Sequence, residues 1–382
     1  FLRGVSSPGY PGEAGDGIRL VCGRLFAGTW SKASQRGEDE KSMVTGDRPR
    51  ILVTGYGGFL GAAICRKLLE EGFRVRGLSR GSYPKMTQLG VEAIQGDITD
   101  RAVCERAFGG VVGVVHTAAL AGVWGKAKKY EEVNVLGTQQ VLETAKRAGC
   151  RAMVYTSSPS VTFGGMAQEG IDESVPYPKR WLCHYPRTKA IAERMVLDAN
   201  QDGGMQTCAL RPHLIWGAGD PHLIPRLIER CKQGRLARIG SGDQKIDTVH
   251  VDLAADAHWL ALKNLMSEEP RCGGKPYFIT DGAPIACWDW ITMILNHAGL
   301  SPPRRRIPTG IAYGVGAMLE WYYGVAGRQD EPPMTRFVAL QLGLPHYFSI
   351  QAAGRDFGYH PRIDRIGMLE QMKPWLQQLR GL

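Results

Sequence analysis

The chain has 382 residues, a net charge of +10 at pH 7 and a composition ordinary for a globular enzyme. This length can bury one large core or two smaller ones. The positive charge favours anionic small molecules over nucleic acid, because the densest basic run, Arg304-Arg305-Arg306, is short and is not interleaved with aromatic residues.

Cysteine and histidine usage argues against a disulfide-linked protein and against a metal-binding protein. Nine cysteines are scattered and none forms a CxxC pair, which predicts reduced thiols and a cytoplasmic location. The histidines show no metal-ligand spacing, so we expect no metal site. Residues 1–48 are rich in Gly, Ser, Pro and charge without sustained periodicity, which predicts a disordered leader. The chain begins with Phe, and Met43 is our hypothesis for the natural start.

Short apolar runs alternate with helical patterns from residue 50 to about residue 210. Such alternation is typical of an α/β protein whose parallel sheet is covered on both faces. We predict a dinucleotide-binding domain at 49–212 and a smaller α/β substrate-binding lobe at 213–382, interleaved with it. The predicted strands of the first domain are 50–54, 73–78, 91–96, 111–116, 151–156 and 205–210.

The first predicted strand leads into a glycine turn and a helix. Thr54 and Gly55 follow the apolar run, and Gly55, Gly58 and Gly61 give the spacing GxxGxxG. Free backbone N–H groups and the positive helix end favour an anion there, and glycine lets the backbone approach it closely. In this context the turn indicates the pyrophosphate site of a Rossmann fold.

The ends of the next strands complete a predicted cofactor site. An NAD-selective site carries an acid at the end of the second strand, but this chain has Ser79-Arg80, and Arg80 can pair with a 2′-phosphate. We therefore expect NADP(H), with NAD(H) the less favoured cofactor. Asp97 is a candidate acceptor for the adenine amino group. The predicted cofactor-binding residues are Thr54, Gly55, Gly58, Phe59, Leu60, Gly61, Arg80, Asp97, Ile98, Ala118, Ala119, Tyr185, Lys189 and Pro212.

A serine cluster and a Tyr-x-x-x-Lys pair predict hydride-transfer chemistry. Tyr185 and Lys189 lie four residues apart and so share one face of a helix. A neighbouring ammonium and a nicotinamide cation favour the phenolate, so the tyrosine can exchange a proton with a carbonyl or hydroxyl group. Lys189 can also hold the nicotinamide ribose. Ser158 is the predicted second hydroxyl on the substrate oxygen, with Ser157 or Ser160 as alternatives.

For three further features of the sequence, two roles each remain possible. Asn134, in a helical pattern, is either a cross-link between helix and strand or a support of the active site. Arg211 and His213 can meet a substrate carboxylate, or they can pair structurally with an acid or a main-chain carbonyl. The apolar stretch 311–325 is too short to predict a membrane span and fits either the wall of an apolar pocket or a peripheral membrane contact.

The motifs together resemble the extended short-chain dehydrogenases, and within them the 3β-hydroxysteroid dehydrogenase family. The resemblance spans about residues 50 to 372. It rests on the glycine turn, Gly96-Asp97, Asn134-Val-x-Gly-Thr, the serine cluster and Tyr185-x-x-x-Lys189, with the stretches 155–158, 211–217 and 247–252 as further marks.

More specific stretches resemble the bacterial 2-alkyl-3-oxoalkanoate reductases of long-chain olefin biosynthesis. They are 80–84, 121–125, 331–337 and 345–349. This resemblance implies NADPH-dependent reduction of a hydrophobic β-keto acid to the β-hydroxy acid, with Tyr185 as proton donor. It also carries two hypotheses on partners, a homodimer and a complex with other olefin-pathway enzymes.

Three other functions remain open. The first is NAD(P)-dependent oxidation of a steroid, or of a sterol-like 3-hydroxy acid that then loses its carboxylate. The second is nucleotide-sugar epimerisation, which uses the same Tyr/Lys pair but is disfavoured by the apolar C-terminal region. The third is cofactor sensing without turnover, which the complete Ser/Tyr/Lys set argues against.

Overall fold

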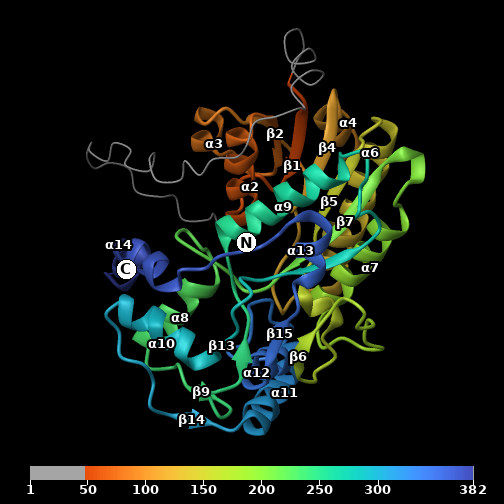
Figure 1. Cartoon of the computed structure of the whole chain (residues 1–382). Coiled ribbons are helices and arrows are strands. Elements are labelled where there is room, and N and C mark those ends of the chain that lie inside the picture. The colour runs from red at the N-terminus through yellow and green to blue at the C-terminus, as the bar shows by residue number, and fades with distance from the viewer. Residues whose placement is uncertain (1–47, 382) are drawn as a thin grey trace. The chain divides into compact units, whose positions relative to one another are not determined.

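A parallel sheet of seven strands forms the core of the computed structural model, which describes residues 48–381 (Figure 1). The order across the sheet is β12-β7-β5-β4-β1-β2-β3. The predicted doubly wound α/β fold is thereby confirmed, and the predicted leader lies, apart from Arg48, outside the described residues. The strands are β1 Arg50–Thr54, β2 Arg74–Ser79, β3 Glu92–Gln95, β4 Val111–His116, β5 Ala152–Thr156, β7 Gln206–Pro212 and β12 Pro276–Ile279.

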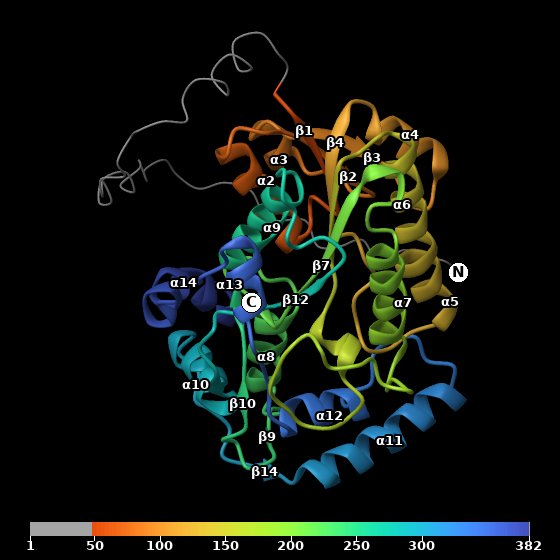
Figure 2. The same ribbon diagram turned by 45° about the vertical axis from the view of Figure 1, so that its right-hand side comes forward.

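Helices cover both faces of this sheet, because successive side chains of each strand point to opposite faces. In β1, Ile51 and Val53 pack in one cluster with α2 and α9, whereas Leu52 packs in the other cluster with α4, α6 and α7. Figure 2 shows α6 and α7 on one side of the sheet. The bounds are α2 Phe59–Glu70, α4 Arg101–Phe108, α6 Gly137–Arg147, α7 His184–Asp198 and α9 Val251–Leu265.

The strand order reverses beside β1, which pairs with β2 on one edge and with β4 on the other. The chain therefore leaves β1 and β4 in diverging directions, at Gly55 and Thr117. Ligands of open α/β sheets bind in the crevice that this divergence creates at the carboxyl ends of the strands. Thr117 links the two strand ends at the base of the crevice, because its Oγ1 donates a hydrogen bond to the carbonyl oxygen of Thr54 at 2.7 Å.

Smaller sheets and helices of the C-terminal part lie beyond these strand ends. One sheet has the order β13-β10-β15-β6, and two strand pairs join β8 to β11 and β9 to β14. Strand β6 pairs with β15, and strand β12, from later in the chain, completes the edge of the seven-stranded sheet beside β7. The strands are β6 Gln168–Ile171, β8 Ile215–Trp216, β9 Arg238–Ile239, β10 Lys245–Ile246, β11 Val249–His250, β13 Ile285–Ala286, β14 Arg306–Ile307 and β15 His346–Phe348.

The apolar stretch 311–325 forms most of a long helix in this part, α11 Thr309–Val325. Helices α8, α10 and α14 share an apolar cluster built on Trp216, Trp288 and Trp290. The remaining helices are α8 Leu223–Lys232, α10 Cys287–His297, α11 Thr309–Val325, α12 Arg336–Gly343, α13 Gln351–Phe357 and α14 Arg365–Gly381, with short α3 Pro84–Gln88 and α5 Ala127–Tyr130 and a π-helical segment at Glu131–Leu136.

Candidate active site

The glycine turn after β1 is held by backbone geometry that side chains would disrupt. Gly55 has φ +72°, and its N–H donates to the carbonyl oxygen of Leu78 at 2.7 Å. A Cβ atom on Gly61 would lie 2.2 Å from the carbonyl oxygen of Gly55. Helix α2 begins at Phe59 without a capping side chain or an acidic residue in its first turn. Its first N–H groups therefore remain available for an anion.

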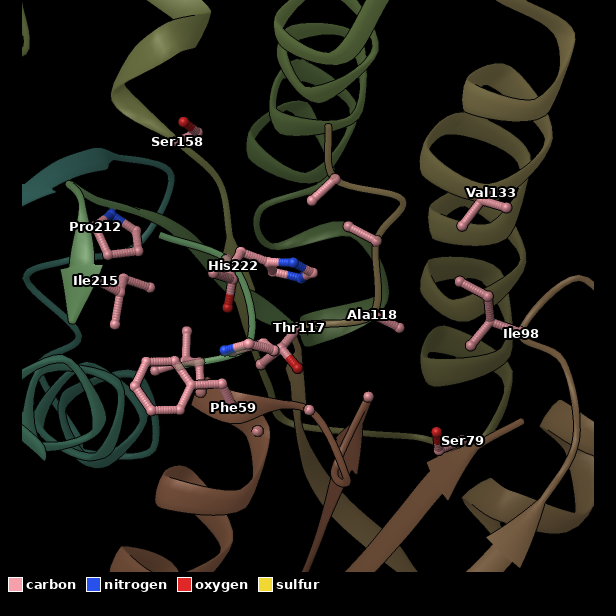
Figure 3. A pocket seen from close by; sticks show the side chains of 18 of the residues that line it. Phe59, Ser79, Ile98, Thr117, Ala118, Val133, Ser158, Pro212, Ile215 and His222 are labelled. Carbon is pink, nitrogen blue, oxygen red and sulfur yellow. The ribbon is translucent and has the colours of Figure 1, made fainter. Parts of the chain in front are cut away.

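A cavity of about 590 Å³ opens beside this turn, at the carboxyl ends of the central strands (Figure 3). In Figure 3, Ser79 and Ser158 lie toward opposite ends of the view, with Thr117 and Ala118 between them. The cavity brings together all but one of the predicted site residues, namely Gly55, Gly58, Phe59, Leu60, Gly61, Arg80, Asp97, Ile98, Ala118, Ala119, Ser158, Tyr185, Lys189 and Pro212.

The exception is Thr54, which is fully buried beneath the cavity and does not line it. Its Oγ1 lies 2.6 Å from Nδ1 of His116 and accepts a hydrogen bond from the N–H of Ala118 at 3.2 Å. Thr54 therefore ties the end of β1 to the end of β4. The sequence Thr54-Gly55 predicts a turn at the end of the strand, but it does not predict the direction in which the threonine hydroxyl points.

A second, smaller cavity of about 180 Å³ adjoins the first. Ser158, Tyr185, Pro212 and Leu214 line both cavities. Among the described residues that line the smaller one there is no lysine or arginine. Its remaining walls combine aromatic, aliphatic and neutral polar side chains: Gly122, Val123, Pro159, Ser160, Phe163, Gln168, His213, Phe337, Gln341, His346 and Phe348.

Helix α7 carries the tyrosine and lysine into the first cavity. Pro186 is tolerated in its first turn because an N–H there needs no helical partner. The ammonium group of Lys189 donates to the carbonyl oxygen of Thr156 and lies 4.1 Å from the ring centroid of Tyr155. These contacts fix Lys189 between α7 and the end of β5.

The three candidate serines differ in the cavity that each one lines. Ser158 Oγ lies 2.9 Å from Ser160 Oγ, and Ser158 reaches both cavities. Ser157 lines only the larger cavity and Ser160 only the smaller one. The location of Ser158 thus fits a hydroxyl group that meets substrate and cofactor together.

Asn134 supports this arrangement from the π-helical segment. Its side-chain amide donates to the carbonyl oxygen of Leu120 at 3.0 Å and to Thr188 Oγ1 at 3.1 Å, and it accepts from the N–H of Leu120 at 2.7 Å. It therefore links the segment after β4 to α7, next to Lys189. Asn134 is thus a cross-link, although to a loop and a helix and not to a strand, and its support of an active site stays a prediction.

Arg211 and His213 meet different surroundings. The Arg211 guanidinium donates to Glu193 at 3.0 and 2.6 Å, with both side chains almost completely buried, and it lines neither cavity. The structural interpretation of Arg211 therefore holds. His213 lies in the smaller cavity, with its Nδ1 2.7 Å from the carbonyl oxygen of Asp247.

Several cavity residues have no counterpart among the predicted ones. Tyr83, Thr117, Val133, Leu214, Ile215 and the segment 220–223 also line the larger cavity. The position of Asp220 could have been predicted from the sequence, because an acidic residue just before a helical pattern is a typical helix cap. Its carboxylate accepts from the N–H groups of His222, Leu223 and Ile224 at the start of α8.

The sequence model of the 3-beta hydroxysteroid dehydrogenase/isomerase family matches residues 52–309, which include the glycine turn and the Ser/Tyr/Lys set. The chain belongs to this family. The predicted assignment to an NAD(P)-dependent oxidoreductase is thereby confirmed.

Individual family members are similar to this chain in sequence, and solved structures are similar to it in fold. A 2-alkyl-3-oxoalkanoate reductase of Shewanella oneidensis is 47% identical over 84% of this chain and 84% of its own length. A 3 beta-hydroxysteroid dehydrogenase/Delta 5-->4-isomerase of Mycobacterium tuberculosis is 35% identical over 88% of this chain and 93% of its own. The Thermus thermophilus UDP-glucose 4-epimerase in complex with NAD shares the fold, with a TM-score of 0.65 and 22% identity over 86% of this chain and 99% of that chain.

Burial dominates the ionisation of the Tyr/Lys pair in this family member. It raises the pKa of Tyr185 to about 12, against a hydrogen bond with Ser158 that lowers it, and it lowers the pKa of Lys189 to about 7. The expected lowering of the tyrosine pKa by Lys189 is not seen: Ser158 is the group that lowers this pKa, and burial prevails. Tyr185 keeps its proton at neutral pH, which suits a group that donates a proton to a carbonyl oxygen.

The buried ammonium of Lys189 predicts a pH-dependent effect on stability. Its folded pKa of about 7 lies below its usual value, so the full cost of burying the charge is present below pH 7. That cost is relieved as pH rises from about 7 toward 10, because the folded chain then binds fewer protons than the unfolded chain. We expect Lys189→Met to raise the free energy of unfolding by about 1–2 kcal/mol at pH 6.

Urea unfolding at several pH values measures this difference. The advantage of Lys189→Met over the wild type should shrink between pH 7 and pH 9. A constant difference across that range, or a variant less stable than the wild type at pH 6, would show that the ammonium is not destabilising.

Proposed function

We propose that this protein reduces a 2-alkyl-3-oxoalkanoate to the 3-hydroxy acid with NADPH. The observation that carries the proposal is the position of Ser158 and Tyr185, which line both cavities. A carbonyl group bound there faces two hydroxyl groups on one side and the glycine-turn cavity on the other. The likeness to the Shewanella reductase supports the choice of substrate class.

The residues of the larger cavity fit a dinucleotide. The glycine turn leaves no room for a Cβ at Gly61, and the first N–H groups of α2 lack side-chain partners. The pyrophosphate would rest there, with the adenine near Asp97 and the nicotinamide ribose near Tyr185 and Lys189. When bound, NADPH supplies the hydride that reduces the carbonyl carbon.

The protein's own groups act on the carbonyl oxygen. Tyr185, protonated at neutral pH, donates its phenolic proton as negative charge develops on that oxygen. Ser158 donates a second hydrogen bond to the same oxygen and so holds it toward Tyr185. Lys189 fixes the ribose hydroxyl groups and keeps α7 anchored to the end of β5 through Thr156.

The smaller cavity suits the apolar part of the substrate. Phe163, Phe337 and Phe348 supply aromatic walls, whereas Gln168 and His213 are among its neutral polar groups. Burial lowers the pKa of His213 well below its usual value, so its ring is neutral at pH 7. We infer that the alkyl chains are held by apolar contacts, since neutral His213 already donates its one N–H, at Nδ1, to the carbonyl oxygen of Asp247.

The cofactor preference rests on Arg80, which lines the larger cavity at the end of β2. We expect Arg80→Glu to raise KM for NADPH by at least about tenfold, because a carboxylate replaces the partner of the 2′-phosphate. KM for NADH should change by less than about threefold. Steady-state kinetics with both cofactors test this.

Arg66→Glu is the matched control, since Arg66 is exposed on α2 and does not line the cavity. It makes the same change of charge and should leave both KM values within about twofold. A parallel rise of KM for NADPH in both variants would assign the effect to net charge and remove Arg80 from the site.

A second candidate function is oxidation of a steroid or of a sterol-like 3-hydroxy acid, which the Mycobacterium relative favours. It would use the same Tyr185 in the opposite direction. A panel of 2-alkyl-3-oxo acids with NADPH, set against 3-hydroxysteroids with NAD+, separates the two. Faster turnover of the steroids by at least tenfold would overturn the reductase proposal.

A further inference from the structure

Helix α11 presents a continuous apolar face to solvent. Its exposed residues recur at intervals of four and three, which places them along one side of the helix. Each is between 41% and 73% exposed. The face, here called the α11 stripe, consists of Ile311, Val315, Met318, Trp321, Tyr322 and Val325.

The opposite side of α11 packs against the protein. Ala312, Gly316 and Tyr323 are buried, and a Cβ on Gly316 would lie 2.6 Å from the carbonyl carbon of Thr335 just before α12. Figures 1 and 2 both show α11 at the edge of the molecule, beyond α12. The stripe is therefore the outward side of a helix that is fixed by its inner side.

The α11 stripe carries no charge. Glu320 is the one charged residue in the sequence of α11, and it turns toward Arg336, accepting its Nε–H at 2.6 Å and its backbone N–H at 2.7 Å. An exposed helix of a soluble surface normally places its charged residues outward. Here the outward side is apolar and the single acid is neutralised inside.

Unpaired positive charge adjoins the start of α11. Arg304, Arg305 and Arg306 are exposed, and within residues 48–381 no carboxylate forms an ion pair with any of them. Strand β14 pairs with β9, which brings Arg238 alongside Arg306. Asp243 lies near Arg306 and offsets part of this charge, but Arg304, Arg305 and Arg306 together keep an excess of positive charge.

We propose that α11 binds the surface of an anionic lipid membrane, with the stripe among the acyl chains and Arg304–Arg306 on the lipid phosphates. Trp321 and Tyr322 have the amphipathic rings that favour the membrane interface. With 17 residues α11 is about 26 Å long, and within residues 48–381 no helix is long and apolar enough to cross a bilayer. A second copy of this chain would also cover the stripe, but the exposed arginines beside it favour an anionic surface.

The proposed membrane surface lies next to the wall of the smaller cavity. Phe337 and Gln341 of α12 line that cavity, and α12 packs directly on α11. The segment 121–125 also reaches α11, since Trp124 stacks edge-on against Tyr323 and donates to the carbonyl oxygen of Arg328 at 3.2 Å. On the function proposed above, a substrate with long alkyl chains could then pass from the lipid into the cavity.

Vesicle flotation of the full chain tests the proposal without any turnover. The probe is a vesicle of one part phosphatidylglycerol to two parts phosphatidylcholine, compared with phosphatidylcholine alone. We expect binding to the anionic vesicles that weakens at high salt. Met318→Gln/Trp321→Gln/Val325→Gln should reduce the partition coefficient by at least roughly 100-fold, and Arg304→Gln/Arg305→Gln by roughly 20-fold.

Matched controls change equally exposed residues elsewhere. Leu89→Gln/Met166→Gln/Ile366→Gln and Lys179→Gln/Arg180→Gln should leave vesicle binding within about twofold. No binding of the full chain, or equal losses in controls and test variants, would overturn the proposal. So would light scattering that shows the stripe variant losing a dimer while vesicle binding persists. NADPH oxidation with a soluble substrate is measured separately, so failure of the function remains distinguishable.

Discussion

Tyr185→Phe should lower kcat roughly 100- to 10,000-fold while the dissociation constant for NADPH stays within about threefold. The variant removes one oxygen atom from a ring that lines both cavities, so the cofactor cavity keeps its shape. The loss falls on kcat because the proton is transferred only as hydride reaches the carbonyl carbon. Stopped-flow fluorescence of bound NADPH and steady-state kinetics measure the two quantities separately.

Tyr359→Phe is the matched control for this loss. Tyr359 is buried, and its hydroxyl donates to the carbonyl oxygen of Thr280 at 2.9 Å, outside both cavities. It should cost stability but leave kcat within about twofold. If Tyr185→Phe kept most of kcat, the phenol would not be the proton donor. If it also lost NADPH, the change would be structural.

Arg211→Met should lower the free energy of unfolding by about 3–5 kcal/mol, because it leaves the Glu193 carboxylate buried without its cation. Glu193 is 0% exposed and also accepts a hydrogen bond from Tyr177 at 2.6 Å. The pair joins β7 to α7 one helical turn after Lys189, so it stabilises the helix that carries Tyr185 and Lys189.

A double variant distinguishes the lost ion pair from lost packing. Arg211→Met/Glu193→Leu removes both charges and should recover at least half of the lost stability in urea unfolding. If the double variant were as unstable as the sum of the two single variants, the cost would come from packing and not from an uncompensated charge.

The sheet and the cofactor cavity were predictable because their signals are local. Each central strand is buried on both faces and therefore appears as a short apolar run, as Ile51 to Val53 do before Gly55. The glycines of the turn are needed where backbone atoms meet, at Gly55 and Gly61, so their spacing follows from the local path of the chain. These features do not depend on distant partners.

Features that depend on distant partners were not readable. Strand β6 pairs with β15, where Gln168 lies opposite the distant His346, and its sequence, Gln168 to Ile171, is not apolar. The sequence also could not decide between Arg211 as a substrate ligand and as a structural residue, since its partner Glu193 lies on another element. The pKa of Tyr185 depends on its burial in the fold, which the motif Tyr-x-x-x-Lys does not reveal.

Isotope transfer from the cofactor tests the central claim most directly. The enzyme is incubated with a 2-alkyl-3-oxoalkanoate and NADPH that carries deuterium at either the 4R or the 4S position, and the product is analysed by mass spectrometry. The proposed function predicts one deuterium on C3 of a 2-alkyl-3-hydroxy acid from one of the two cofactors, and none with Tyr185→Phe. Absence of labelled hydroxy acid from both cofactors, with active enzyme confirmed on a steroid, would contradict it.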